Sequence, residues 1–166
     1  MATEENAWAA FAGESQANRK YANFAQQADA EGYPLVARIF RAASEAEAIH
    51  ARRLLIALKA VGTTEENLSA AVSGETEEYE AMYPGFIKEA QEEGVTAPVD
   101  IFTHAMKAEE VHAGIYAAAL AAVQGKKDLE AKEVYVCPYC GNVVLNEPPE
   151  HCPICGVPGS KFILVE

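Results

Sequence analysis

Five glutamates and two histidines occupy positions of this sequence where side chains of a helical core are expected. Four long stretches repeat apolar residues at steps of three and four, as helices packed in a bundle do, and ionisable residues interrupt each series. Burying an ionised carboxylate without a partner costs several kcal/mol, so we expect these side chains to hold a cation. The seven residues are Glu14, Glu47, His50, Glu75, Glu78, Glu109 and His112.

The spacing of these residues supports a shared metal site. The motif Glu-x-x-His occurs at residues 47–50 and again at residues 109–112, and it places a carboxylate and an imidazole one turn apart on one helix face. A single glutamate precedes each motif at almost the same distance, Glu14 before the first and Glu75 before the second. The whole set therefore repeats at a nearly constant offset, so the first helical hairpin resembles a duplicate of the second.

Four glutamates and two histidines in this two-fold arrangement are typical of di-iron or di-manganese sites inside four-helix bundles. Carboxylates bridge two cations and offset their charge, and imidazoles fill terminal positions without adding negative charge. Glu78 breaks the symmetry, because Gln16 and Ala17 stand at the equivalent positions of the first hairpin. The competing interpretation is that the glutamates are solvated. Two motifs in register with the apolar series favour the metal.

A second metal site is predicted near the C-terminus. The two segments Cys137-Pro-Tyr-Cys140-Gly and Cys152-Pro-Ile-Cys155-Gly are matched knuckles, and four thiolates on two tight turns can bind one tetrahedral ion. Taken alone, the pattern favours a structural zinc ribbon over a disulfide pair. Beside a redox-capable di-iron site it favours an electron-transfer iron, and zinc remains the alternative.

Glycine and proline divide the chain into elements. They predict four long helices of about 27 residues each, joined by short connections, and residues 63–66 read as a capping box before the third. The helical stretches run from about Thr3 to Gly32, from Pro34 to Gly62, from Thr63 to Gly94 and from about Pro98 to Gly125, and the apolar series of the second extends to Val61.

Three segments follow from this division. Residues 1–125 are expected to form an all-α four-helix bundle, and residues 126–134 a charged linker. Residues 135–166 change to Cys, Pro, Gly, Val and Ile, which predicts a small β and turn domain held together by a metal.

Charge and hydropathy narrow the classes of partner. The formal charge is −12, from 13 basic and 25 acidic residues, which argues against nucleic acid and anionic membranes as partners. The most apolar stretch, residues 113–123, is too short to cross a bilayer, and the N-terminus has no signal-peptide pattern. We therefore expect a soluble, cytoplasmic protein.

Taken together, these motifs resemble rubrerythrin over nearly the whole chain. The resemblance implies a ferritin-like bundle with an oxo- and carboxylate-bridged di-iron centre and a rubredoxin-like Fe(Cys)4 domain. It also implies a homodimer that reduces hydrogen peroxide with NAD(P)H through separate reductases, in defence against oxidative stress. The segments that carry it are residues 11–21, 31–34, 47–51, 74–84 and 108–112 and the two knuckles.

The resemblance also implies roles for individual residues. Glu47 and Glu109 would bridge the irons, with terminal ligands from Glu14, Glu75 and His112, and with Glu78 and His50 as alternative ligands to one iron. Tyr21 and Tyr83 match tyrosines that hydrogen-bond to ligands, although simple packing would explain them as well. The resemblance is weaker at the spacer between Cys140 and Cys152, which is one residue shorter than in many members, so zinc and His151 stay open as alternatives there. His104 lies off the Glu-x-x-His register and is taken as ordinary, and Trp8 as core or interface.

Two other functions fit parts of the pattern. A ferritin-like enzyme that oxidises ferrous iron would need the bundle site alone. A non-enzymatic metal-binding protein would carry structural zinc at the knuckles and turn over no peroxide.

The two ligand sets predict the metal content. We expect three iron atoms per chain, two at the carboxylates and one at the cysteines, and a red oxidised protein because thiolate-to-iron charge transfer absorbs visible light. Metal analysis with a visible spectrum, after expression with ample iron, measures both. Colourless protein with one zinc and no other metal would contradict the redox interpretation.

Overall fold

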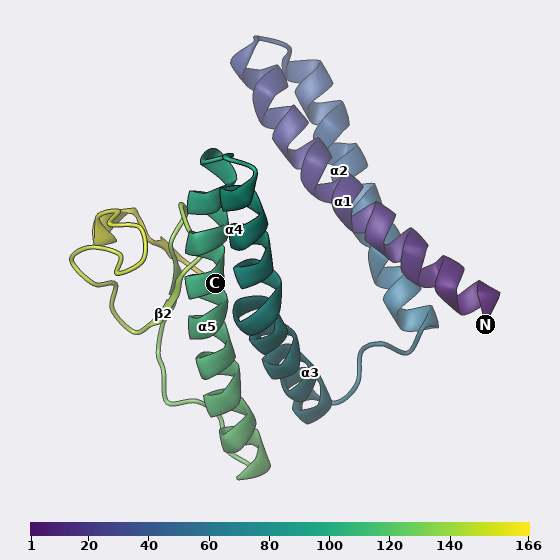
Figure 1. Ribbon diagram of the computed structural model, residues 1–166. Helices are drawn as coiled ribbons and strands as arrows, with labels where there is room; N and C mark the ends of the chain where they lie inside the picture. The colour runs from purple at the N-terminus through teal and green to yellow at the C-terminus, as the bar shows by residue number, and fades with distance from the viewer. The chain divides into compact units, whose positions relative to one another are not determined.

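The computed structural model describes residues 1–166 and divides them into two compact units, residues 1–62 and residues 63–166 (Figure 1). The first unit is a helical hairpin. The second unit contains another helical hairpin and the small C-terminal domain.

The first unit pairs α1 (Ala2–Ala30) with α2 (Pro34–Ala57). The turn between them depends on Gly32, whose φ of +83° is a conformation that side chains disfavour, and Pro34 starts α2 in its first turn. Small residues let the two helices approach closely, and the side chain of Asn18 ties them by donating to the carbonyl of Ser44 at 2.7 Å. The buried residues of this hairpin are Ala25, Ala28, Ala37 and Ala51.

The second helix is shorter than the sequence predicts. It ends at Ala57, because Lys59 takes a left-handed conformation with φ of +52° and the N–H of Ala60 returns to the carbonyl of Leu55 at 3.0 Å. Val61, expected on the core face of this helix, therefore lies beyond it and is 62% exposed. That prediction was wrong, because a local helix cap overrode the apolar spacing.

The second hairpin begins at the predicted capping box. Thr63 accepts from the N–H of Glu66 at 3.3 Å, and Glu66 accepts from the N–H of Thr63 at 2.7 Å, which confirms the box. The chain then runs through α3 (Thr64–Glu77), a π-helical turn η1 (Glu78–Met82) and α4 (Tyr83–Glu92) without a break, and α5 (Ala97–Gln124) packs against all three.

The π turn interrupts what the sequence predicts as one regular helix. Tyr21 is the seventh residue after Glu14, whereas Tyr83 is the eighth residue after Glu75, so the second hairpin holds one more residue between these points. A π turn accommodates one extra residue inside a helix without breaking it. The insertion therefore explains both the turn η1 and the lack of a counterpart for Glu78 in the first hairpin.

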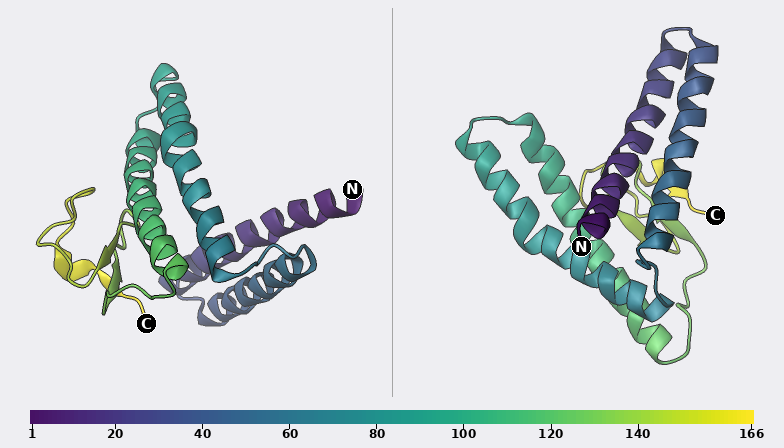
Figure 2. Two further views of the ribbon diagram at one scale, coloured as in Figure 1. Left: turned by 90° about the horizontal axis from the view of Figure 1, so that it is seen from below. Right: turned by 90° about the vertical axis from the view of Figure 1, so that its right-hand side faces the viewer.

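The C-terminal domain is a three-stranded antiparallel sheet in the order β2-β1-β3 with two cysteine knuckles. Its strands are β1 (Val134–Val136), β2 (Val143–Leu145) and β3 (Ile163–Leu164), and a 3-10 turn, η2 (Gly159–Lys161), precedes β3. The buried centre contains Cys137, Cys152 and Phe162, which is too little apolar surface to hold a domain without a metal. Strand β2 contacts α5, so the sheet lies beside that helix (Figure 2).

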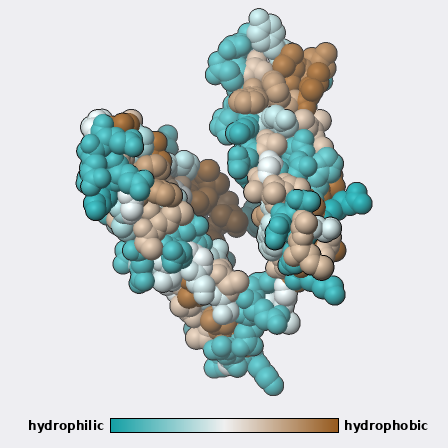
Figure 3. Space-filling model, turned by 45° about the vertical axis from the view of Figure 1, so that its right-hand side comes forward, coloured by the Kyte–Doolittle hydropathy of each residue, from teal (hydrophilic) through white to brown (hydrophobic).

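Apolar side chains also remain at the surface, as the brown regions of Figure 3 show. On α2, Leu35, Ile39 and Ile56 are each at least 60% exposed, so α1 covers only one side of that helix. Trp8 is 44% exposed and contacts Phe11 edge to face at 5.9 Å. No helix combines the length and apolar character that crossing a bilayer needs.

Candidate metal centres

The first candidate centre lies between α1 and α2. Glu14 projects from α1, and Glu47 and His50 project from α2, so that one ligand atom of each lies within 4.8 Å of the other two. Nδ1 of His50 is 2.9 Å from Oε2 of Glu47 and 3.8 Å from Oε2 of Glu14. The predicted residues of the first hairpin are therefore brought together as a triad.

The second candidate centre repeats this geometry in the other unit. Glu75 on α3 and Glu109 and His112 on α5 again place three ligand atoms within 4.8 Å. Nδ1 of His112 is 2.7 Å from Oε2 of Glu109 and 4.0 Å from Oε1 of Glu75. Two hairpins from different parts of the chain thus build the same two-carboxylate, one-imidazole arrangement.

The electrostatics of both triads indicate a missing positive charge. The pKa of Glu14 is raised, mainly by its hydrogen bond to Glu47, and the same bond lowers the pKa of Glu47. Burial and then the charge of Glu109 raise the pKa of Glu75. A divalent or trivalent cation would offset the repulsion between the paired carboxylates, and carboxylates with imidazole suit iron or manganese. The donor sets therefore fit the irons that the sequence predicts.

Glu78 lies next to the second triad but not in it. Its pKa is raised first by burial and then by the charge of Glu75, while His112 lowers it, so its carboxylate is within electrostatic reach of the triad. The π turn that begins at Glu78 makes this position possible. The exchange of Glu78 with His50 as a ligand to one iron stays a prediction.

The two predicted tyrosines lie in aromatic clusters, one in each hairpin. Tyr21 contacts Phe24 and Phe40 at ring-centroid distances of 6.1 and 6.2 Å. Tyr83 contacts Phe86 and Phe102 at 6.2 and 6.1 Å in the same way. Burial and then the negative charge of Glu109, Glu78 and Glu75 raise the pKa of Tyr83, which keeps its hydroxyl protonated beside the carboxylates.

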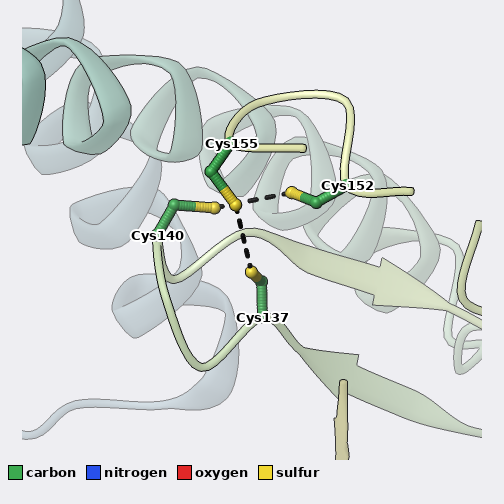
Figure 4. Close-up of side chains that lie close together, drawn as sticks. All are labelled: Cys137, Cys140, Cys152 and Cys155. Atoms are coloured by element: carbon green, nitrogen blue, oxygen red, sulfur yellow. Dashed lines mark hydrogen bonds between the residues drawn. The ribbon is translucent and has the colours of Figure 1, made fainter. Parts of the chain in front are cut away.

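The third candidate centre consists of the four cysteines. Figure 4 shows their side chains pointing into one space from the two knuckles. The sulfur of Cys137 is 3.6 Å from that of Cys155, and the sulfur of Cys140 is 3.5 Å from that of Cys152. Sulfurs placed tetrahedrally at about 2.3 Å from one ion would be about 3.8 Å apart, so the arrangement fits a single metal. His151 is exposed and forms a bridge with Pro158, outside this group of ligands.

The two knuckles share one hydrogen-bond pattern. In the first, the N–H of Gly141 donates to the carbonyl of Cys137 at 3.0 Å, and in the second the N–H of Gly156 donates to that of Cys152 at 2.9 Å. Both glycines have positive φ, +79° and +77°. This conformation turns the next N–H toward sulfur, so that Asn142 donates to Cys140 and Val157 to Cys155.

Electrostatics differ among the thiols. Burial opposes ionisation of Cys152, but N–H groups of Cys155 and Ile154 outweigh it and lower its pKa to about 7. Burial raises the pKa of Cys140. A bound metal would hold all four as thiolates, which is the state in which they ligate.

Asn142 is a further residue of this centre that the sequence analysis did not single out. Its side chain is 3% exposed, and its Nδ2 lies 3.9 Å from the sulfur of Cys152, whereas its Oδ1 has no partner. Aligning the knuckles could have found it, because Cys-Gly-Asn in the first stands against Cys-Gly-Val in the second.

His112 joins the second triad to the first knuckle. While its Nδ1 faces the carboxylates, its Nε2 lies 3.0 Å from the carbonyl oxygen of Gly141. A carbonyl can only accept, so Nε2 carries the proton, and Nδ1, which faces Oε2 of Glu109 at 2.7 Å, is the nitrogen that would ligate a metal. Metal-bound histidines are commonly fixed in this way by a backbone carbonyl. His50, the equivalent residue of the first hairpin, has no such contact and is 53% exposed.

Comparison with known families agrees with this set of sites. The family model described as Rubrerythrin matches residues 5–120, and the one described as Rubrerythrin, rubredoxin-like domain, matches residues 135–163. The chain belongs to the rubrerythrin family. The chain therefore has a di-iron site of the Glu and His type and a four-cysteine, rubredoxin-like site, and the assignment of each triad residue as an iron ligand stays a prediction. Family members are oxidoreductases.

Individual relatives cover nearly the whole chain. Nigerythrin of Nitratidesulfovibrio vulgaris is 37% identical over 96% of this chain and 85% of its own. Rubrerythrin-2 of Clostridium acetobutylicum is 34% identical over 92% and 91%. A solved structure of nigerythrin in a partially reduced state has a TM-score of 0.59 and 36% identity, covering 98% of this chain and 86% of its own. These matches confirm the ferritin-like and rubredoxin-like fold class.

The position of Glu78 beside a complete triad predicts that it tunes reactivity more than metal binding. Glu78→Ala should keep two metals at the carboxylates but change peroxide turnover, whereas Glu47→Ala should lose metal because it removes a triad member. Metal analysis and turnover of both variants measure this. Equal metal loss in the two would show that Glu78 is an ordinary structural ligand.

The position of Asn142 predicts an effect on the Fe(Cys)4 potential. The side-chain N–H of Asn142 near the sulfur of Cys152 stabilises the more negative, reduced Fe(Cys)4 site. Asn142→Val should therefore lower the reduction potential without loss of iron. Spectroelectrochemical titration of the visible absorption measures the shift. Ser160→Ala, an exposed change in the same domain, should leave the potential unchanged, and an unchanged potential in Asn142→Val would show that the amide does not act on the sulfur.

Proposed function

We propose that this protein is a non-haem di-iron peroxidase of the cytoplasm, which reduces hydrogen peroxide to water with electrons relayed through the Fe(Cys)4 site. The electrons would come from NAD(P)H through a separate reductase. The observation that carries the proposal is the contact of His112 with Gly141, since it connects a ligand of one candidate centre to the residue that follows a ligand of another.

The chemistry needs both kinds of metal. When bound, iron at the triads supplies two electrons to hydrogen peroxide, whose O–O bond breaks with two protons to give two waters, and iron at the thiolates replaces the electrons singly. Family membership supports these metals, and solved structures of nigerythrin are described as partially reduced and as fully reduced, all ferrous.

The protein's own residues handle protons and orientation. Burial raises the pKa of Glu78, which lies outside the triad, so this carboxyl can hold and release a proton beside the reacting oxygens. Tyr83 keeps its hydroxyl proton and can donate to a neighbouring oxygen. His112 is held in one tautomer by Gly141, so Nδ1 stays directed at the carboxylates.

The same contact gives the electrons a short route. Cys140 is bonded to Gly141, whose carbonyl accepts from His112, so one peptide unit and one hydrogen bond separate a thiolate from an imidazole ligand. A ferrous-iron oxidase would have no use for this connection. A structural zinc ribbon would need it only for stability.

Removing the thiolate iron should separate the two steps. We expect Cys140→Ser to lose or perturb the Fe(Cys)4 site while the triads, on other elements, still bind iron. Chemically reduced iron at the triads should be oxidised by peroxide about as fast as in the parent. Steady-state turnover driven by NADH through a reductase should collapse, because nothing returns the electrons. Stopped-flow absorption and NADH consumption measure the two rates.

Zinc at the cysteines, with iron retained at the triads, provides the control without mutation. This form should also lose NADH-driven turnover. Full turnover in it would refute the relay and leave the C-terminal domain as scaffold. Oxidation of added ferrous iron by oxygen, with no peroxide turnover in the parent, would instead identify a ferroxidase.

A further inference from the structure

His104 makes the second contact between α5 and the first knuckle. It lies two helical turns before His112 on the same helix, and its ring meets that of Tyr139 edge to face, with centroids 5.9 Å apart and an angle of 67° between the planes. Tyr139 lies between the cysteines of the knuckle, next to Cys140. The sequence alone marked His104 as ordinary, because it is off the Glu-x-x-His register.

Comparison with the first hairpin, which contacts no C-terminal domain in its own unit, shows which residues of α5 differ from their equivalents on α2. At the offset that relates the two Glu-x-x-His motifs, His104 corresponds to Ala42, which is exposed. Only the hairpin that carries the C-terminal domain has a ring at this position. Ala108, one turn from both His104 and His112, is 1% exposed, whereas the equivalent Ala46 is only half-buried.

The packing around the ring pair is open. A cavity of about 420 Å³ adjoins it, lined by Asp100, Ile101, His104, Ala105, Tyr139 and Cys140. The contact between the two rings lies at the edge of this cavity. The hydrogen bond from His112 to Gly141 lies two helical turns further along α5.

We propose that His104 is a positioning residue: its contact with Tyr139 sets the orientation of the first knuckle, so that the carbonyl of Gly141 meets Nε2–H of His112. Strand β2 contacts α5, and the hydrogen bond holds Gly141 at His112. The contact of His104 lies two helical turns, or about 11 Å, before His112, so it constrains the orientation of the knuckle at a third point. His104 touches no ligand of the triad, so it acts on His112 only through the knuckle.

The role in electron transfer rests on the proposed function. Each transfer moves one electron from ferrous iron at the thiolates to ferric iron at the triads, and two transfers restore the two electrons that one peroxide takes up. Loss of the His104 contact would lengthen the time during which Gly141 and His112 are apart. Transfer should slow while the chemistry at each metal stays the same.

The first experiment needs no turnover. In full-length, 15N-labelled protein loaded with zinc at all sites, the Nε2–H of His112 should give a resonance protected from solvent exchange. In His104→Ala, which installs the alanine of the first hairpin, this proton should exchange several-fold faster. His104→Phe keeps a ring and should restore protection, and Lys107→Ala, a change on the same helix, should match the parent.

The second experiment measures transfer between iron sites. Fully reduced, iron-loaded protein is mixed with peroxide, and reoxidation of the Fe(Cys)4 site is followed by its visible absorption. His104→Ala should slow this step about tenfold, with unchanged Fe(Cys)4 potential and an unchanged rate of peroxide consumption in the first turnover. Tyr139→Ala should do the same, and His104→Phe should recover most of the rate.

The outcomes separate the two proposals. Parent-like exchange and parent-like transfer in His104→Ala would overturn the positioning role, even if the protein is a peroxidase. A parent that does not consume peroxide would overturn the proposed function, while the exchange experiment would still decide the role of His104. Loss of metal from both the carboxylates and the cysteines in His104→Ala, not recovered by His104→Phe, would show that His104 has a general structural role. That result would also overturn the proposal.

Discussion

Crowded carboxylates are the constraint on which this structure depends. Each hairpin brings one ligand atom from each of two glutamates and a histidine within 4.8 Å of one another. The pKa of Glu14 is raised mainly by its hydrogen bond to Glu47, and that of Glu75 by burial and then by the charge of Glu109. Such an arrangement is unfavourable for folding alone and becomes favourable when metal binds. Long helices that supply ligands at fixed spacing, joined through small residues such as Ala28 and Ala37, are a simple way to hold these groups.

The two hairpins repeat one arrangement of candidate ligands, and three departures from this repeat distinguish the second hairpin. One inserted residue produces the π turn and with it Glu78. The C-terminal domain covers α5, so that His112 is 19% exposed where His50 is 53% exposed. A histidine replaces alanine at position 104 and meets Tyr139. All three departures lie in the second hairpin, which is also the hairpin that contacts the C-terminal domain.

The cysteine centre also consists of two similar halves, the two knuckles. Both knuckles close with the same backbone hydrogen bonds and a glycine of positive φ, and each directs an N–H toward a sulfur. Asn142 breaks this symmetry as Glu78 breaks that of the hairpins, and it too lies beside a ligand. In both centres, repeated backbone geometry provides the metal site, and the one residue without a counterpart is placed to adjust its properties.

The sequence by itself determined the candidate ligand groups, the helices that carry them and the family, because helical periodicity and Cys-x-x-Cys spacing follow from local geometry. It also determined the capping box at Thr63. It did not determine the end of α2, where the left-handed Lys59 overrode the apolar series, or the π turn, which needs a comparison of the two hairpins. Only the tertiary structure decided that Gly141 accepts from His112 and that His104 meets Tyr139, because the members of each pair lie far apart in the sequence. A local sequence pattern does not specify which residues of α5 contact the C-terminal domain, because the helix and that domain belong to different metal centres.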